Sequence, residues 1–131
     1  MLRYNFTILK KWKEKTMVRK STEAQYVEKK MFDGAGMAKM RLILETNEEM
    51  YNKGRVFNHL YLEPGCEVGW HIHHGDGETY YILKGHGEYN DNGTIVPVGP
   101  GDVTFVDAEE GHSLKNTGDE TLEAIALILF K

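Results

Sequence analysis

The chain has 131 residues, of which 40% are hydrophobic and 27% charged, and its formal net charge is −4. This length suits a single domain, and this composition excludes disordered and fibrous proteins. Its single cysteine, Cys66, excludes an internal disulfide, and no apolar run approaches the roughly 18 residues that span a membrane. Residues 6–9 are too short for the apolar stretch of a signal peptide. We therefore expect a cytoplasmic protein without membrane contact.

Residues 1–30 form a predicted N-terminal extension with a charge unlike that of the rest. The first 20 residues contain seven lysines and arginines against one glutamate, so the remainder is acidic and does not favour nucleic-acid binding. Residues 5–17 could form a short amphipathic helix, and residues 21–23 a turn. Met17 is a second possible start. The basic arm either packs on the acidic body or docks an anionic partner.

Short apolar or alternating runs fill residues 31–131, which we predict to be a β-barrel domain. Turn residues rich in Gly, Pro, Asn and Asp separate the runs, and this spacing is typical of an antiparallel sandwich or barrel. Asn92-Gly93 predicts a two-residue hairpin turn, and residues 45–53 a loop with one helical turn. The expected strands cover residues 37–44, 55–62, 67–73, 79–83, 86–89, 94–98, 103–106, 112–115 and 122–130.

The last expected strand, residues 122–130, is apolar on both faces. A strand of this kind lies inside a sandwich or beneath another subunit. Because Phe32, Met37 and Met40 add further apolar side chains, we expect an outer apolar face that is covered by a partner in a homodimer. The alternative is that residues 1–30 cover this face.

Three histidines and one glutamate form the most informative pattern. His71 and His73 point to the same face of a strand, because alternate residues do so. A turn follows, and Glu78 begins the next strand, where it can meet both imidazoles. His112 starts a more distant strand and could supply a third imidazole. Together these side chains predict a site for one divalent transition metal with open coordination positions.

Two segments resemble the signatures of the cupin family. The first signature, G-x5-H-x-H-x4-E-x6-G, is matched at every fixed position, namely Gly65, His71, His73, Glu78 and Gly85.

The second signature, G-x5-P-x-G-x2-H-x3-N, is matched by Gly101, His112 and Asn116. Asp107 stands in place of its proline and Glu109 in place of its glycine, which puts the shape of a loop in doubt. The resemblance covers about residues 55–130 and implies a double-stranded β-helix, the jelly-roll barrel of cupins, with a metal inside.

The resemblance implies a function only in outline. Mn or Fe is favoured as the metal, with Zn, Ni or Co possible. A metalloenzyme would chelate a small oxygenated substrate, such as a carboxylate, keto acid or sugar, and catalyse its decarboxylation, isomerisation or oxygenation. Relatives of similar form include oxalate-decarboxylase-like proteins. The alternative is a non-catalytic, metal-dependent protein that binds a small molecule.

Five further residues are candidates for the same cavity. His59 and Tyr61 share one face of a strand and would lie near the metal if that face is internal; if Asn58 and Leu60 face inward instead, both drop out. Tyr80 is in phase with Glu78 and should face inward. The candidate catalytic residues are His59 and Tyr80. Three residues are expected to contact the substrate: Phe105 as an apolar wall of the cavity, Arg41 as a partner for a carboxylate, and Tyr61.

Overall fold

The computed structural model describes residues 17–131, so the helix expected over residues 5–17 falls outside the described residues apart from Met17. Two 3-10 turns, η1 (Ser21–Glu23) and η2 (Glu48–Met50), accompany the strands. The strands are β1 (Gln25–Lys29), β2 (Ala38–Leu44), β3 (Gly54–Leu62), β4 (Glu67–Ile72), β5 (Asp76–Lys84), β6 (Gly87–Asp91), β7 (Thr94–Val98), β8 (Val103–Val106), β9 (Gly111–Asn116) and β10 (Leu122–Phe130).

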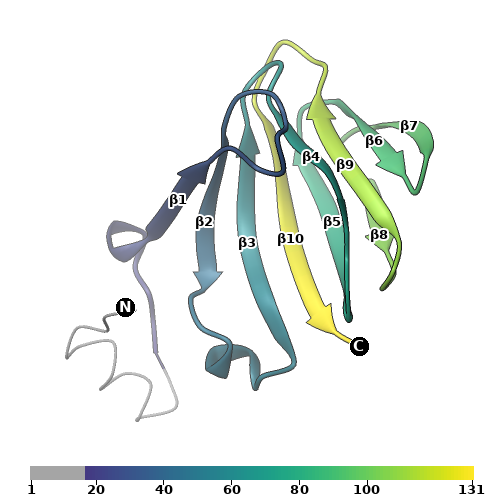
Figure 1. Ribbon diagram of the computed structural model, residues 1–131. Helices are drawn as coiled ribbons and strands as arrows, with labels where there is room; N and C mark the ends of the chain where they lie inside the picture. Colours follow the sequence, from purple (N-terminus) through teal and green to yellow (C-terminus); the bar gives the residue numbers. More distant parts are fainter. Residues whose placement is uncertain (1–16) are drawn as a thin grey trace.

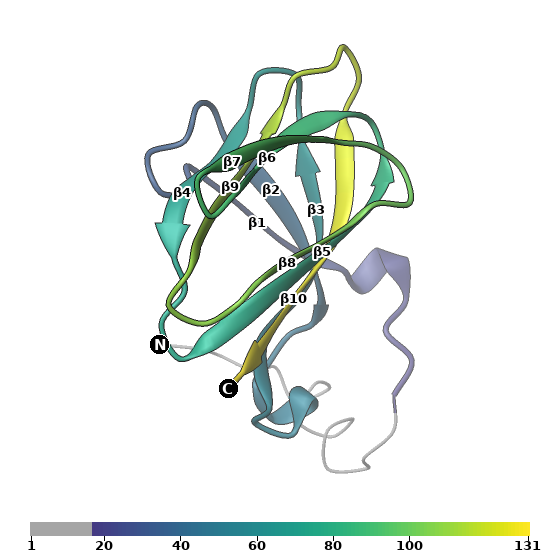
Figure 2. The same cartoon turned by 90° about the vertical axis from the view of Figure 1, so that its right-hand side faces the viewer.

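Two antiparallel sheets form the barrel. One has six strands in the order β1-β2-β3-β10-β5-β8, and the other has four in the order β4-β9-β6-β7 (Figure 1). The sheets curve around a common interior (Figure 2). The predicted all-β jelly-roll class is therefore confirmed. No helix in residues 17–131 has the length and apolarity needed to cross a bilayer.

The core lies between the two sheets and follows the two-residue period of the strands. On β10 the buried residues alternate with half-buried ones as far as Ile128. The side chains that alternate toward the interior include Leu62, Ile82, Leu114 and Leu122, all of them almost completely buried. Burial of this apolar surface is the main favourable contribution to the stability of the fold.

The hairpin between β6 and β7 turns at Asn92 and Gly93, as the sequence predicts. Both residues have positive φ, 48° and 109°, and the flanking Asp91 and Thr94 pair across the strands. Asparagine and glycine tolerate this left-handed region better than other residues, which explains why these two occupy the turn.

Strand β1 lies within the segment that we assigned to the extension, yet it pairs with β2 at the edge of the six-stranded sheet. Before it, Arg19 forms ion pairs with Glu45 at 3.1 Å and Glu49 at 2.8 Å. This part of the basic segment therefore packs on acidic residues of the body, as one of our two alternatives expects.

The chain that follows β1 runs along β4. The Gly69 N–H donates to the Met31 carbonyl oxygen at 3.0 Å, and the Glu67 N–H donates to that of Ala35 at 2.8 Å. A Cβ atom at Gly69 would collide with the backbone of Phe32, so glycine permits this close approach. The contact places residues 31–35 beside β4, the strand that carries His71.

Candidate metal centre

Three strands and one turn bring the predicted ligands together. His71 lies on β4 directly opposite His112 of β9, and His73 follows the end of β4. Glu78 is on β5, in the other sheet. The centre therefore lies between the two sheets, and its four donor groups all lie within 4.8 Å of one another.

The three Nε2 atoms form an equilateral triangle, because each of the His71–His73, His73–His112 and His112–His71 distances is 3.1 Å. The Oε1 atom of Glu78 lies 3.1 Å from the Nε2 of His112, 3.3 Å from that of His73 and 4.0 Å from that of His71. His73, Glu78 and His112 are buried, and His71 is partly buried.

These distances fit a divalent cation with six-coordinate preferences. Three ligands at right angles and about 2.2 Å from a shared ion lie about 3.1 Å apart, which is the spacing of the nitrogens. The Oε1 atom of Glu78 is close to two of the nitrogens and farther from the nitrogen of His71. A regular tetrahedron would instead make all the spacings equal. A six-coordinate cation held by these four side chains would have two further positions for other ligands.

Each imidazole uses its other nitrogen in a hydrogen bond. The Nδ1–H of His71 donates to the Gly69 carbonyl oxygen at 2.8 Å, and that of His73 donates to Asp76 at 2.7 Å. The hydroxyl oxygen of Tyr89 lies 2.9 Å from Nδ1 of His112 and can accept in the same way. Hydrogen bonds of this kind fix the tautomer, so that the Nε2 lone pairs point to one place.

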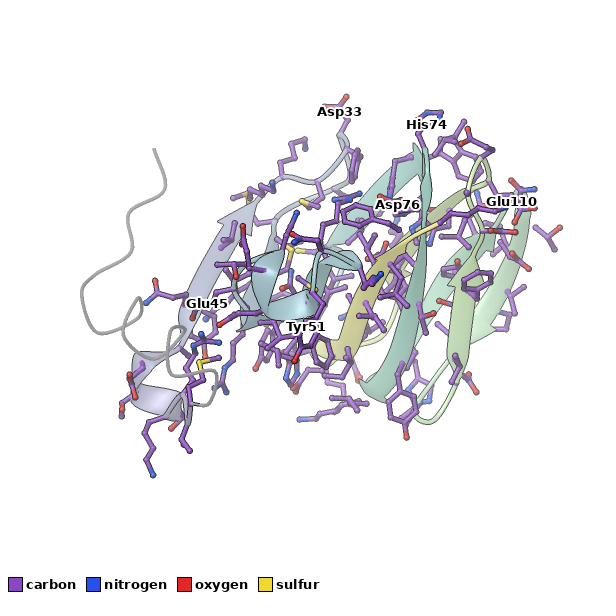
Figure 3. All side chains as sticks on the ribbon, turned by 90° about the horizontal axis from the view of Figure 1, so that it is seen from below. Asp33, Glu45, Tyr51, His74, Asp76 and Glu110 are labelled. Carbon is purple, nitrogen blue, oxygen red and sulfur yellow. The ribbon has the colours of Figure 1, made fainter. Side chains whose placement is uncertain are left out.

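Asp76 and Arg55 are parts of the site that the sequence analysis missed. Asp76 is almost fully buried, and its second oxygen accepts a hydrogen bond from Nε of Arg55 at 2.7 Å. In Figure 3 Asp76 lies toward the interior, whereas the exposed His74 stands at the periphery. Asp76 follows His73 by three residues, and this short spacing within a turn was the available signal.

The ionisable groups influence one another strongly when no cation lies between them. Burial opposes the charge of Glu78, but hydrogen bonds from His112 and His73 outweigh it and lower its pKa to about 2. Hydrogen bonding to Glu78 likewise raises the pKa of His73, against the effect of burial. Burial lowers the pKa of His71. A carboxylate that stays ionised among imidazoles is suited to binding a cation.

Tyr80 faces inward, as predicted from its phase with Glu78. Its ring is buried and stacks on that of His112, with centroids 5.3 Å apart and planes at 11°. Burial raises the pKa of Tyr80 well above its ordinary value. The hydroxyl group therefore keeps its proton and can donate a hydrogen bond, but it cannot act as a base at neutral pH.

His59 and Tyr61 lie on the outer face of β3, so the expectation that they line the cavity is corrected. Their rings stack on each other at 4.3 Å, and His59 contacts Glu123 at 2.9 Å. Asn58 and Leu60 face inward instead. The reason is register: a strand presents alternate residues to each face, and pairing with β10 determines which set is internal.

Arg41 and Phe105 are also placed outside the cavity. Arg41 pairs in register with His59 and shares its outward face. Phe105 is 60% exposed, because the inward positions of β8 are taken by Thr104 and Val106. Neither residue can contact a molecule bound at the metal centre.

A cavity of about 210 Å³ adjoins the centre and is mostly apolar. Its cationic side chains are Lys29 and Arg55. The residues lining it are Val27, Lys29, Met31, Phe32, Met40, Leu42, Arg55, Val56, Asn58, Leu60, Val68, His71, His73, Glu78, Tyr80, Ala126 and Ile128.

An aromatic side chain from the N-terminal part of the chain closes one side of the centre. Phe32 stacks on His71, with ring centroids 3.9 Å apart and an interplanar angle of 11°. Its φ of 51° is in the left-handed region, which is uncommon for a phenylalanine. The sequence analysis did not connect Phe32 with the site, because the two rings are far apart along the chain.

A jelly-roll barrel with three imidazoles and one carboxylate between its sheets, a cluster that could hold a metal ion, defines a class of small all-β barrel proteins. Residues 58–128 match the Cupin domain, and the chain belongs to the cupin family.

Known relatives agree with this assignment. The chain is 46% identical to an oxalate-binding protein of Thermotoga maritima over 99 residues, which are 76% of this chain and 81% of that protein. A crystal structure described as a predicted oxalate decarboxylase from Thermotoga maritima is 43% identical, with a TM-score of 0.82 over 88% of this chain and all of that one. A sugar phosphate isomerase of the cupin superfamily from Silicibacter pomeroyi shares the fold at 16% identity, with a TM-score of 0.67 over 88% of this chain and 76% of that one.

Proposed function

We propose that the protein binds one divalent transition metal through His71, His73, Glu78 and His112 and uses it to bind a small carboxylate. The observation that carries the proposal is the convergence of three Nε2 atoms, spaced 3.1 Å apart, whose Nδ1 partners leave their lone pairs free. Without a cation, the three nitrogens would face one another at 3.1 Å, with the Glu78 carboxylate as the shared hydrogen-bond partner of His73 and His112. The spacing favours Mn or Fe over tetrahedral Zn.

The chain's own residues would prepare the site for an anion. The metal would supply Lewis-acid polarisation of a carboxylate that chelates it through two oxygens. Arg55 lines the cavity and is partly exposed, and its guanidinium group pairs with Asp76 at 2.7 Å. The Tyr80 hydroxyl keeps its proton and donates to the Glu78 carboxylate, which helps to position this ligand. Similarity to an oxalate-binding protein makes oxalate the first ligand to test.

The proposal is tested by metal analysis and calorimetry. Purified protein should contain about one equivalent of metal, and metal-loaded protein should bind oxalate, whereas chelator-treated protein should not. His71→Ala should lose both properties while keeping its fold. His74→Ala is the matched control, because His74 is exposed and pairs only with Glu109 at 2.9 Å. Equal losses in both variants, or binding of oxalate without metal, would contradict the proposal.

Decarboxylation is a second candidate function, supported by the 43% identity to the protein described as a predicted oxalate decarboxylase and by the open coordination positions. The C–C bond of oxalate would break, carbon dioxide would leave, and the remaining carbon would take up a proton to give formate. Tyr80 is a protonated group beside the metal ligands. Formation of ¹³C-formate from ¹³C-oxalate, reduced in Tyr80→Phe without loss of metal, would support catalysis; its absence would leave a binding protein.

We also propose that two copies of the chain pair through the outer face of the six-stranded sheet. Tyr81, Leu83, Phe105 and Leu129 expose between 40% and 60% of their surface on β5, β8 and β10. Exposed apolar patches of this kind mark interaction sites. Phe105→Glu should shift the mass in sedimentation toward the monomer, whereas Ile95→Glu, at an exposed position on β7, should not. A monomeric native protein would refute the pairing.

A further inference from the structure

We propose that the ligand of this site is a carboxylate or 2-oxo acid with a short aliphatic tail, rather than oxalate alone. The head group would chelate the metal, and the tail would lie on an apolar floor that leads away from it. This inference rests on the proposed metal and carboxylate binding. It adds the chemical class of the remainder of the ligand.

The floor is a row of side chains that crosses four strands. Tyr80 of β5 pairs in register with Ala126 of β10, Ala126 with Asn58 of β3, and Asn58 with Leu42 of β2. All four residues line the cavity. Because Ala126 is small, it leaves space directly beside Tyr80.

A second row runs parallel to the first and extends the apolar surface. Glu78 pairs with Ile128, and Ile128 pairs with Val56. On the other side of the first row, Met40 pairs with Leu60 of β3 and with Val27 of β1 at the far edge. The floor therefore changes from metal ligands at one end to aliphatic side chains at the other.

The length of this floor exceeds what oxalate can fill. Adjacent strands lie about 4.8 Å apart, so three steps from Tyr80 to Leu42 cover about 14 Å. Bonds of about 1.2–1.5 Å let two carboxylates joined by one C–C bond reach less than half of that distance. A dianion would also leave the aliphatic part of the floor without an apolar partner.

The two cationic side chains that border the cavity, Lys29 and Arg55, are exposed, and they lie at different ends of it. Arg55 pairs with Asp76 beside the metal ligands, and Lys29 is on β1 at the far edge. Glu78 is the only carboxylate among the described residues that line it, and it belongs to the metal ligands. Asn58 is the one amide on the floor. A ligand that carries its negative charge at the metal end and an aliphatic chain at the other matches this arrangement.

The test is a chain-length series on metal-loaded protein. Calorimetry would compare oxalate, pyruvate, 2-oxobutyrate, 2-oxopentanoate and 2-oxohexanoate. Each buried methylene should strengthen binding about fourfold, so the longest 2-oxo acid, which has three more methylenes, should bind about 60-fold more tightly than pyruvate. Affinities that stay flat along the series while oxalate binds would overturn the inference and leave the proposed function intact. Failure of every acid to bind metal-loaded protein would overturn both.

Two variants localise the tail. Ala126→Val should remove most of the gain with chain length and leave the metal content unchanged. Ala124→Val is the matched control, because Ala124 is buried on the same face of β10 but does not line the cavity. Leu42→Ser, at the far end, should weaken only the longer acids. Equal effects of Ala126→Val and Ala124→Val on the series would overturn the placement of the tail, as would an unchanged series in Leu42→Ser.

Discussion

The carboxylate of Asp76 should control how tightly the centre holds its metal. One oxygen accepts from Nδ1 of His73 and the other from Nε of Arg55, both at 2.7 Å. An asparagine at this position has only one acceptor oxygen, so its amide N–H group would face either the imidazole N–H or the guanidinium N–H. His73 would then lose either its orientation or the negative charge that makes it a stronger ligand.

The expected loss of metal affinity in Asp76→Asn follows from the hydrogen bond between Asp76 and His73. Loss of a partner that orients a metal-binding histidine weakens metal binding by about 10- to 100-fold, which corresponds to about 1.4–2.7 kcal/mol. We expect Asp76→Asn to lie within this range, because Asp76 is 4% exposed and water cannot readily replace it.

Competition titration with a fluorescent chelator measures the affinity directly. Asp102→Asn is the control, since the carboxylate of Asp102 accepts the Gly99 N–H at 2.8 Å in a turn and contacts none of the ligands. An affinity within twofold of the native value for Asp76→Asn would refute the reasoning. So would an equal loss in the control.

Three further predictions concern the surroundings of the centre. Phe32→Ala should weaken metal binding by about 2- to 10-fold in the same titration, because His71 loses its stacking partner. Tyr51→Ala is the control and should not weaken metal binding, because Tyr51 is an exposed aromatic residue that also has positive φ. The chelator-treated protein should lose on the order of 3 kcal/mol of stability as pH falls from 4.5 to 2. In that window Glu78 takes up a proton in the unfolded chain, whereas in the folded protein it stays ionised until the pH approaches 2. Urea unfolding of the Glu78→Gln variant should not show this loss. Asn116→Ala should lower the free energy of unfolding by about 2–4 kcal/mol, because its buried amide donates to two carbonyl oxygens and accepts one N–H; a loss under 1 kcal/mol would contradict this account.

Local sequence patterns were sufficient to predict the strands and turns that carry the candidate metal ligands. The alternation of His71 and His73, the turn before Glu78 and the Asn92-Gly93 hairpin depend on residues that are close in sequence. A strand's two-residue period and the conformational preferences of turn residues act within a few positions, so these features can be read without knowing the partner strands.

The residues around the metal centre were decided only by tertiary structure. Strand β3 has apolar side chains on both faces, so its sequence did not show that Asn58 rather than His59 faces the cavity. Likewise Arg55 and Phe32 reach the centre through contacts with distant parts of the chain. Alternation within one strand shows which residues share a face, but pairing between strands determines which face is internal, and that depends on residues far apart in sequence.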